Sequence, residues 1–304
     1  LTIVVVYLLA KDILKEERAA LIAAFFFAIS AYAIRNNTEM DGIAIFFIMA
    51  SVLFYIKGLR EKDNYFIPAA LFLGLAVLNK PFSALLAPIY IIYYAIYHRG
   101  IPLPFSRIKI IVLSIGIILL MAFPILWYNY ALYTQKNMLD VYLAPYVSGL
   151  DKEWYDQFGL ENPWTTERFK EVAKKRLTDF FSLDPILSTL ALVGLALMVK
   201  RKEKFIGFFI LFILLYVSFL WGTPGGGGKN HQVLFFPIFA ILGTYGIRQI
   251  MPWIPKVPEK KMIIGLLIAA GLLSGVFLFD ELTEKSALVQ LRETVQKNIE
   301  ESSL

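Results

Sequence analysis

The sequence contains no cysteine. Disulfide bonds, iron–sulfur clusters and cysteine-based zinc sites are therefore excluded for these 304 residues. Charged residues make up only 18% of the chain, and histidine occurs twice. Despite a formal net charge of +6, no basic stretch with interleaved aromatic residues stands apart from the apolar segments, so nucleic-acid binding is not expected. No internal repeat is evident, which counts mildly against a transporter.

Apolar residues are abundant instead, at 58% of the chain, with a mean hydropathy of +0.63. A single soluble core cannot bury this much apolar surface, so lipid is the expected solvent for most side chains. The fold class predicted is all-α, a polytopic transmembrane protein with about nine full spans and part of a tenth. The runs are 18–34, 42–57, 65–79, 82–97, 108–128, 185–199, 205–221, 233–247 and 262–279.

The first ten residues, LTIVVVYLLA, form the partial span. They are too few to cross about 30 Å of hydrocarbon. They also lack a preceding basic region and a following small-residue cleavage site, so they are not interpreted as a signal peptide. We interpret them as the end of a helix that begins upstream of Leu1.

Basic residues gather in every second loop between the apolar runs, which predicts that these loops face the cytoplasm. They are Lys11, Lys15, Arg18, Lys57, Arg60, Lys62, His98, Arg99, Arg107, Lys109, Lys200, Arg201, Lys202, Lys204, Arg248, Lys256, Lys260 and Lys261. The remaining connections are predicted on the non-cytoplasmic face, which is extracellular, periplasmic or lumenal. The localisation expected is a multi-pass protein of a cell membrane.

This alternation divides the chain into four parts. Residues 1–128 are predicted to be N-terminal transmembrane helices, and 129–184 an exoplasmic loop region. Residues 185–279 are predicted to be C-terminal transmembrane helices, and 280–304 a charged exoplasmic tail, helical for much of its length. Within the loop region, a helix from Pro163 to about Phe181 is predicted to lie along the membrane surface. Its apolar side would hold Phe169, Val172, Ala173, Leu177 and Phe180.

A polar turn, Arg35–Asp41, joins the first two full spans on the predicted outer side. Glu39 and Asp41 could act as a base, orient a hydroxyl group or hold a divalent cation. If the turn were helical, their spacing of two would place them on different faces, so joint action requires a loop. The alternative is that Asp41 only caps the following helix, because an acid suits the positive end of the helix dipole.

Lys80, in Asn79-Lys80-Pro81, is a cation between two apolar runs on the predicted outer side. Proline disfavours helix at the preceding residue, so a tight hairpin is expected here. A lysine at headgroup depth suits a phosphate, although it could simply extend its ammonium group toward the interface.

The segment Gly222–His231 is rich in glycine. It fails the phosphate-loop pattern, because Thr223 replaces the first glycine and Asn230 replaces the serine or threonine. A loop closing over a substrate, with Lys229 and His231 meeting an anionic headgroup, competes with a plain flexible linker.

Aromatic residues are common on the predicted outer side, where they could stack on sugars or form an interfacial belt. They are Trp127, Tyr128, Tyr130, Tyr133, Tyr142, Tyr146, Trp154, Tyr155 and Trp164. The belt is the preferred interpretation for most of them.

Four segments together resemble the GT-C glycosyltransferases that use sugars linked to lipid phosphates, in the branch of protein O-mannosyltransferases and the lipid A aminoarabinose transferase. They are AISAYAIRNNTEMDGIAIFFIMASVLFYIKG, FIPAALFLGLAVLNKPFSALLAPIYIIYYAIY, FPILWYNYALYTQ and KNHQVLFFPIFAILGTYGI. The second segment is the strongest match, since it resembles the family hairpin G-L-A-x-L-x-K-P/G. The resemblance covers most of residues 1–250 and rests on the order of the segments.

The resemblance implies an inverting transfer of a sugar from a polyprenyl-phosphate donor to a protein or lipid acceptor on the non-cytoplasmic face. It assigns catalysis to Asp41 or Glu39, although the family places its acid five residues after the arginine, where this chain has Met40. Lys80 corresponds to the hairpin lysine. Arg35, Lys229 and His231 are further candidates for substrate binding. The principal acid of the family would lie upstream of Leu1.

Two other functions remain open. A transporter or flippase of a lipid-linked sugar predicts charged residues near the middle of the spans, and few occur there. A membrane scaffold without chemistry explains the spans but leaves Lys80 and the acidic turn unexplained. No resident metal or other cofactor is assigned, although the acidic turn could hold a divalent cation.

Overall fold

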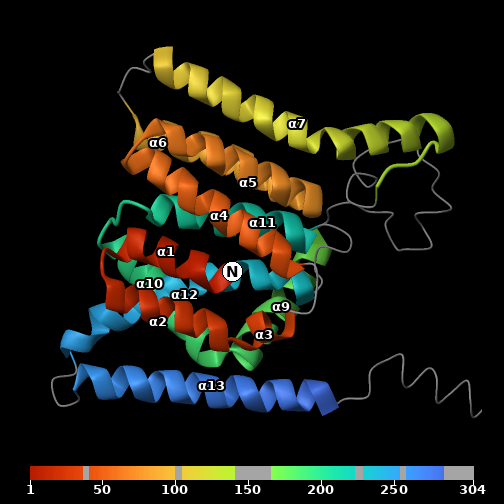
Figure 1. Ribbon diagram of the computed structural model, residues 1–304. Coiled ribbons are helices and arrows are strands. Elements are labelled where there is room, and N and C mark those ends of the chain that lie inside the picture. Colours follow the sequence, from red (N-terminus) through yellow and green to blue (C-terminus); the bar gives the residue numbers. More distant parts are fainter. Residues whose placement is uncertain (37–40, 100–104, 141–165, 223–228, 254–257, 284–304) are drawn as a thin grey trace, which may run out of the picture.

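The computed structural model is a bundle of helices that run roughly parallel and antiparallel (Figure 1). It describes residues 1–36, 41–99, 105–140, 166–222, 229–253 and 258–283. Within these ranges every regular element is helical, so the predicted all-α class is confirmed there.

Each of the nine predicted apolar runs contains a helix. The α-helices are α1 (Thr2–Leu14), α2 (Glu17–Ile29), α3 (Ala31–Asn36), α4 (Asp41–Arg60), α5 (Phe66–Asn79), α6 (Leu86–Tyr97), α7 (Phe105–Lys136), α9 (Thr166–Leu183), α10 (Pro185–Lys200), α11 (Ile206–Gly222), α12 (Phe236–Ile250) and α13 (Glu259–Thr283). Short 3-10 turns are η1 (Asp63–Tyr65), η2 (Pro81–Leu85), η4 (Lys229–Phe235) and η5 (Met251–Trp253). The run 18–34 differs from a single span, because extended backbone at Ser30 separates α2 from α3.

Most successive helices reverse direction, so the described helix ends collect at two opposite ends of the bundle (Figure 1). The left end of that view holds the last residues of α1, α4, α6, α10 and α12 and the first residues of α2, α5, α7, α11 and α13. The right end holds the last residues of α3, α5 and α11 and the first residues of α4. Helix ends next to connections that are predicted to share a face therefore lie at the same end.

Helix α12 is the most deeply buried helix of the described bundle, with every residue from Phe236 to Ile247 buried except Phe239. It packs closely on α10, where glycines bring the two backbones together. A Cβ atom added to Gly194 would lie 1.8 Å from the carbonyl oxygen of Leu242. This contact therefore leaves no space for a side chain on α10 at that point.

Ion pairs hold the left end of the bundle together across the sequence. Arg248 on α12 pairs with Glu16 at 2.6 Å and donates to the carbonyl of Leu14 at 3.1 Å. Arg107 on α7 pairs with Asp63 at 2.8 Å. Several basic residues of this end thus have acidic partners within the protein.

Three described helical segments are long and apolar enough to cross a membrane. They are Gly42–Arg60, Arg107–Lys136 and Gln232–Trp253. A fourth candidate is the pair Phe169–Leu183 and Pro185–Lys200, which is bent by 112°. Shorter apolar helices accompany them. This supports a multi-pass membrane protein with three or four candidate spans, and not the full predicted count of nine.

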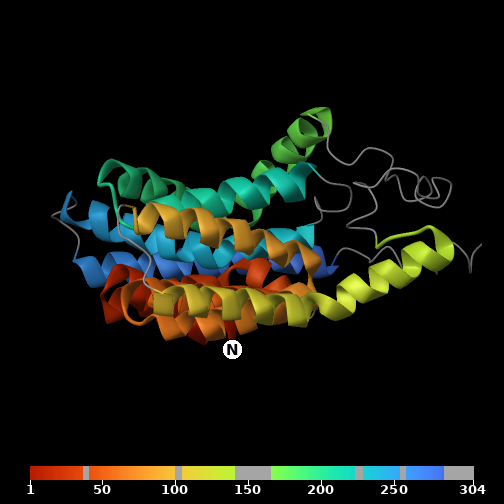
Figure 2. The same ribbon diagram turned by 90° about the horizontal axis from the view of Figure 1, so that it is seen from above.

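Helix α7 extends beyond the rest of the bundle at the right end, and α9 projects from the upper side of the bundle near that end (Figure 2). Of the helix predicted from Pro163, the structure describes α9 from Thr166, and Pro163 lies outside the described residues. Its apolar side is largely as predicted, with Phe180 buried and Phe169 partly buried. Leu177 is 50% exposed, so its place on the membrane surface stays a prediction.

Candidate active site

The hairpin that contains Lys80 forms as predicted. Helix α5 ends at Asn79, Lys80 is extended with φ −142° and ψ 107°, and η2 begins at Pro81. The Lys80 amide donates to the carbonyl of Ala76 at 2.8 Å, and the Lys80 carbonyl accepts from Ser83 at 2.9 Å. These bonds hold the backbone of Lys80 at the tip of the hairpin.

A contact across the bundle fixes this hairpin further. The hydroxyl of Tyr216 on α11 donates to the carbonyl of Ser83 at 3.4 Å, and its ring meets that of Phe82 edge to face at 6.3 Å. Tyr216, Phe82 and Ser83 are all buried. The turn that carries Lys80 is therefore packed into the bundle on one side.

The polar turn lies between α3 and α4. Ser30 begins α3 by accepting the Ala33 amide on its hydroxyl oxygen at 3.1 Å, which is an N-cap arrangement. Helix α4 begins at Asp41, in agreement with a helix start there. Glu39 lies outside the described residues, as do the side chains of Arg35 and Asp41.

Trp221 and Gln232 flank the glycine-rich segment in sequence and contact each other. The indole N–H of Trp221 donates to the Gln232 side-chain oxygen at 2.9 Å, and both residues are buried. Phe169 and Phe180 of α9 pack on the Trp221 ring at 6.1 and 6.3 Å. Residues 223–228 and the side chains of Lys229 and His231 lie outside the described part of the chain.

The backbone brings three of these segments to one end of the bundle. The 3-10 turn η4, which holds Lys229 and His231, packs against α3 and α4, which hold Arg35 and Asp41. The Lys80 turn lies at the same end (Figure 1). Three segments that are distant in sequence thus lie at one end, where they could act on a single substrate.

Asp184 is a buried residue of this end that the sequence analysis missed. Its carboxylate accepts from the Ala31 amide and from the Ser274 hydroxyl, each at 3.1 Å, and so joins α3 and α13 to the start of α10. An aspartate followed by proline ahead of an apolar run is typical of a helix start, and this pattern could have identified it. Asp184 positions α3, the helix that carries Arg35.

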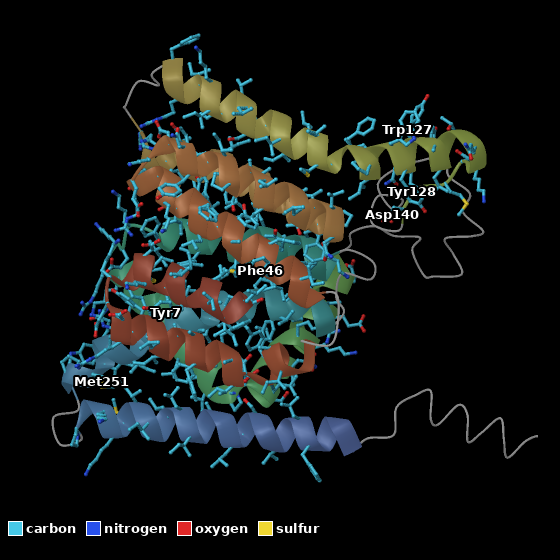
Figure 3. The ribbon with its side chains drawn as sticks, viewed as in Figure 1. Tyr7, Phe46, Trp127, Tyr128, Asp140 and Met251 are labelled. Atoms are coloured by element: carbon cyan, nitrogen blue, oxygen red, sulfur yellow. The ribbon has the colours of Figure 1, made fainter. Side chains whose placement is uncertain are left out.

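The outer part of α7 presents aromatic side chains near the same end (Figure 3). Trp127, Tyr128 and Tyr130 are each more than half exposed. The chain then turns back, because the Asp140 amide donates to the Asn129 side-chain oxygen at 2.8 Å. Exposed rings suit either an interfacial belt or sugar stacking.

No group of three or more His, Asp or Glu side chains forms a metal-binding cluster among the described residues. Glu39 and the Asp41 side chain lie outside the described part of the chain. A cation held at the polar turn therefore stays a prediction.

Comparison with known proteins bears on the part of the chain that holds the polar turn and the hairpin. Residues 1–128 match the family model of dolichyl-phosphate-mannose-protein mannosyltransferases. This region is a domain of that family. The mannosyltransferase domain contains α1 to α6 and most of α7, and with them Arg35, Asp41 and Lys80.

The match confirms the predicted resemblance for residues 1–128 and identifies the domain as that of a polyprenyl-phosphate-sugar-dependent glycosyltransferase. Lys229 and His231 lie beyond the matched residues. No curated protein and no solved structure shows a significant match to the chain.

Proposed function

We propose that the protein is an inverting membrane mannosyltransferase that uses a polyprenyl-phosphate-mannose donor and a protein acceptor. Its site would lie at the end of the bundle where the polar turn, the Lys80 hairpin and η4 meet. The observation that carries the proposal is that this hairpin and this turn both belong to a mannosyltransferase domain and lie at one end.

The proposal includes the full membrane arrangement. Nine spans with a partial tenth would place residues 129–184 and 280–304 on the non-cytoplasmic face, between and after the helices of 1–128 and 185–279. Several described helices are shorter than the roughly 20 residues that a perpendicular span needs, so flanking residues would have to complete them. The basic end would then face the cytoplasm.

In the proposed reaction, an acceptor hydroxyl oxygen attacks the anomeric carbon on the face opposite the phosphate. The new carbon–oxygen bond forms as the bond to the phosphate oxygen breaks, which inverts the anomeric centre. The hydroxyl proton passes to a carboxylate, for which Asp41 and Glu39 are the candidates. The polyprenyl phosphate leaves with the bonding electron pair.

Lys80 would stabilise the charge that develops on the departing phosphate. Arg35, Lys229 and His231 would supply further positive charge or hydrogen bonds to the phosphate and the sugar. The turn at Lys80 suits this role because its backbone is hydrogen-bonded and packed, so little ordering is required when the donor binds.

The test measures mannose transfer from polyprenyl-phosphate-mannose to a serine- and threonine-containing acceptor protein, with the full-length enzyme in a bilayer. We expect Lys80→Ala to lower kcat by about 100-fold or more, the loss typical when one electrostatic stabiliser of a transition state is removed. Lys80→Arg should retain more activity than Lys80→Ala, because a guanidinium group also binds phosphate.

Lys62→Ala is the matched control, since Lys62 is an exposed lysine at the opposite end of the bundle. Its turnover should equal that of the unaltered enzyme. Full turnover by a properly folded Lys80→Ala variant would remove Lys80 from the phosphate site.

A further inference from the structure

A cavity of about 240 Å³ lies between α5, α6 and α7, away from the Lys80 hairpin. Its walls are apolar and include Leu73 on α5, Ala87 and Ile91 on α6, and Ile115 and Ile118 on α7. Apolar walls of this kind favour hydrocarbon groups over water. The cavity therefore suits an alkyl chain.

Apart from the Tyr94 hydroxyl, the side-chain polar groups in the cavity wall are engaged within the protein. The Ser114 hydroxyl donates to the Phe66 carbonyl at 3.3 Å. The Tyr90 hydroxyl bonds with the Ser51 hydroxyl at 2.8 Å, and the Tyr55 hydroxyl donates to the Tyr90 carbonyl at 2.7 Å. These bonds leave the interior without a requirement for a polar ligand.

A polar cluster borders this cavity at the basic end of the bundle. Tyr94 belongs to both, because it lines the cavity and its ring lies 4.6 Å from that of His98. Arg107, one helical turn before the wall residue Ile111, pairs with Asp63 at 2.8 Å. Lys204 lies nearby, with its ammonium 4.3 Å from the centroid of the Tyr97 ring.

Two buried atoms of the cluster, the Tyr94 hydroxyl oxygen and His98 Nε2, lack a hydrogen-bond partner in the part of the chain that the structure describes. The Tyr94 hydroxyl also lies close to Arg107. Burial lowers the pKa of His98, and the charge of Arg107 lowers it further while Asp63 opposes the shift. The His98 imidazole can donate a hydrogen bond beside the Arg107 cation, which suits an anionic oxygen ligand.

We propose that the cavity and the cluster together bind one anionic phospholipid, with an acyl chain between α5, α6 and α7 and the phosphate beside Arg107, Tyr94 and His98. The charge at this end favours such a headgroup, because four basic residues outnumber three acidic ones there: Arg99, Arg107, Lys109 and Lys204 against Glu61, Asp63 and Glu203. The bound lipid fills the space beside α7, whose side chains lie mostly at the surface of the bundle.

This lipid is distinct from the glycosyl donor. Lys80 follows the last residue of α5, whereas the cluster lies near the first. The 14 residues of α5 extend about 21 Å at 1.5 Å per residue, so the two phosphates would lie in opposite leaflets. The site requires a bilayer but not transferase activity.

The test places the full-length protein in nanodiscs of phosphatidylcholine with a small fraction of phosphatidylglycerol and counts retained lipids by native mass spectrometry. The unaltered protein should retain one phosphatidylglycerol in preference to phosphatidylcholine. Ala87→Phe, which fills the cavity, and the double variant Asp63→Asn/Arg107→Gln, which leaves neither charge unpaired, should each weaken retention by about tenfold or more.

Two controls match these variants. Ala95→Phe makes the same change at an exposed position of α6, and Lys62→Gln removes an exposed charge at the same end. Both should retain the lipid. The proposal is overturned if folded Ala87→Phe protein retains phosphatidylglycerol normally, if phosphatidylcholine is retained equally well, or if inorganic phosphate or polyprenyl phosphate displaces the lipid at comparable concentrations.

Discussion

Asp184 is a single buried carboxylate on which the geometry of the candidate site depends. It holds the first amide of α3 and the Ser274 hydroxyl of α13 from its position at the start of α10. No long-range contact of this kind could be predicted from the sequence, because Ala31 and Asp184 are 153 positions apart. Local chemistry indicates a helix start at Asp184 but does not identify its partners.

We expect Asp184→Ala to lower the free energy of unfolding by about 1–3 kcal/mol, the typical effect of leaving a buried hydrogen-bonding group unsatisfied. Asp184→Asn should lose less, since an amide oxygen can still accept the Ala31 amide. Thermal melting of both variants in detergent checks this prediction. Equal melting temperatures for Asp184→Ala and the unaltered protein would contradict it.

Other single residues show where sequence reasoning succeeds. Lys80 is extended as Pro81 requires, and Asp41 begins a helix as its preference for helix starts suggests. Gln232 shows where it fails, since no sequence pattern indicated that it is the buried partner of Trp221. Only the folded chain reveals that pair.

At the level of elements, the crossing of α10 and α12 depends on small residues. Gly246 faces Gly194 across the contact, where an added Cβ atom would lie 3.0 Å from the Gly194 nitrogen. The neighbour at Gly194 is backbone, so it cannot move aside as a flexible side chain could. Any side chain on α10 here must separate the two helices.

We expect Gly194→Ala to lower the free energy of unfolding by about 1–3 kcal/mol or more, as is typical when a tightly packed contact is overfilled. The loss should occur even though alanine favours the helix over glycine by about 1 kcal/mol. Gly265→Ala in α13 is the matched control, because nothing lies within 4 Å of its added Cβ atom. The control should melt at the same temperature as the unaltered protein or higher. A Gly194→Ala variant that melts like Gly265→Ala would show that the crossing tolerates separation.

The positions of the helices were predictable because apolar runs bounded by charged or turn-forming residues have a local cause. The depth of burial was not. Helices α7 and α12 both come from apolar runs, yet α7 lies at the periphery and α12 at the centre. Lipid and protein interior are both apolar, so composition does not separate a lipid-facing helix from a buried one.

For the whole molecule, the decisive property is which end of the bundle faces which compartment. The absence of cysteine makes this measurable, since a single introduced thiol has no competitor in these 304 residues. Ala84 in η2 and Lys62 at the opposite end are both exposed and suit labelling.

We expect an impermeant thiol reagent to label Ala84→Cys from the non-cytoplasmic side of sealed vesicles and Lys62→Cys from the cytoplasmic side. The physical reason is that basic loops remain in the cytoplasm during insertion. Lys200→Cys, at the same end as Lys62, should label as Lys62→Cys does. Labelling of Ala84→Cys and Lys200→Cys from one side would contradict the proposed membrane arrangement and the location of the transferase site.

The length of α7 sets where the chain leaves the bilayer. The 30 residues from Arg107 to Lys136 rise about 45 Å, whereas the hydrocarbon layer is about 30 Å thick. A perpendicular crossing that starts at Arg107 uses the helix up to about Trp127, and the last two or three turns then stand in water. An acceptor polypeptide that approaches the proposed donor site would therefore meet the C-terminal end of α7, at a fixed height above the membrane surface.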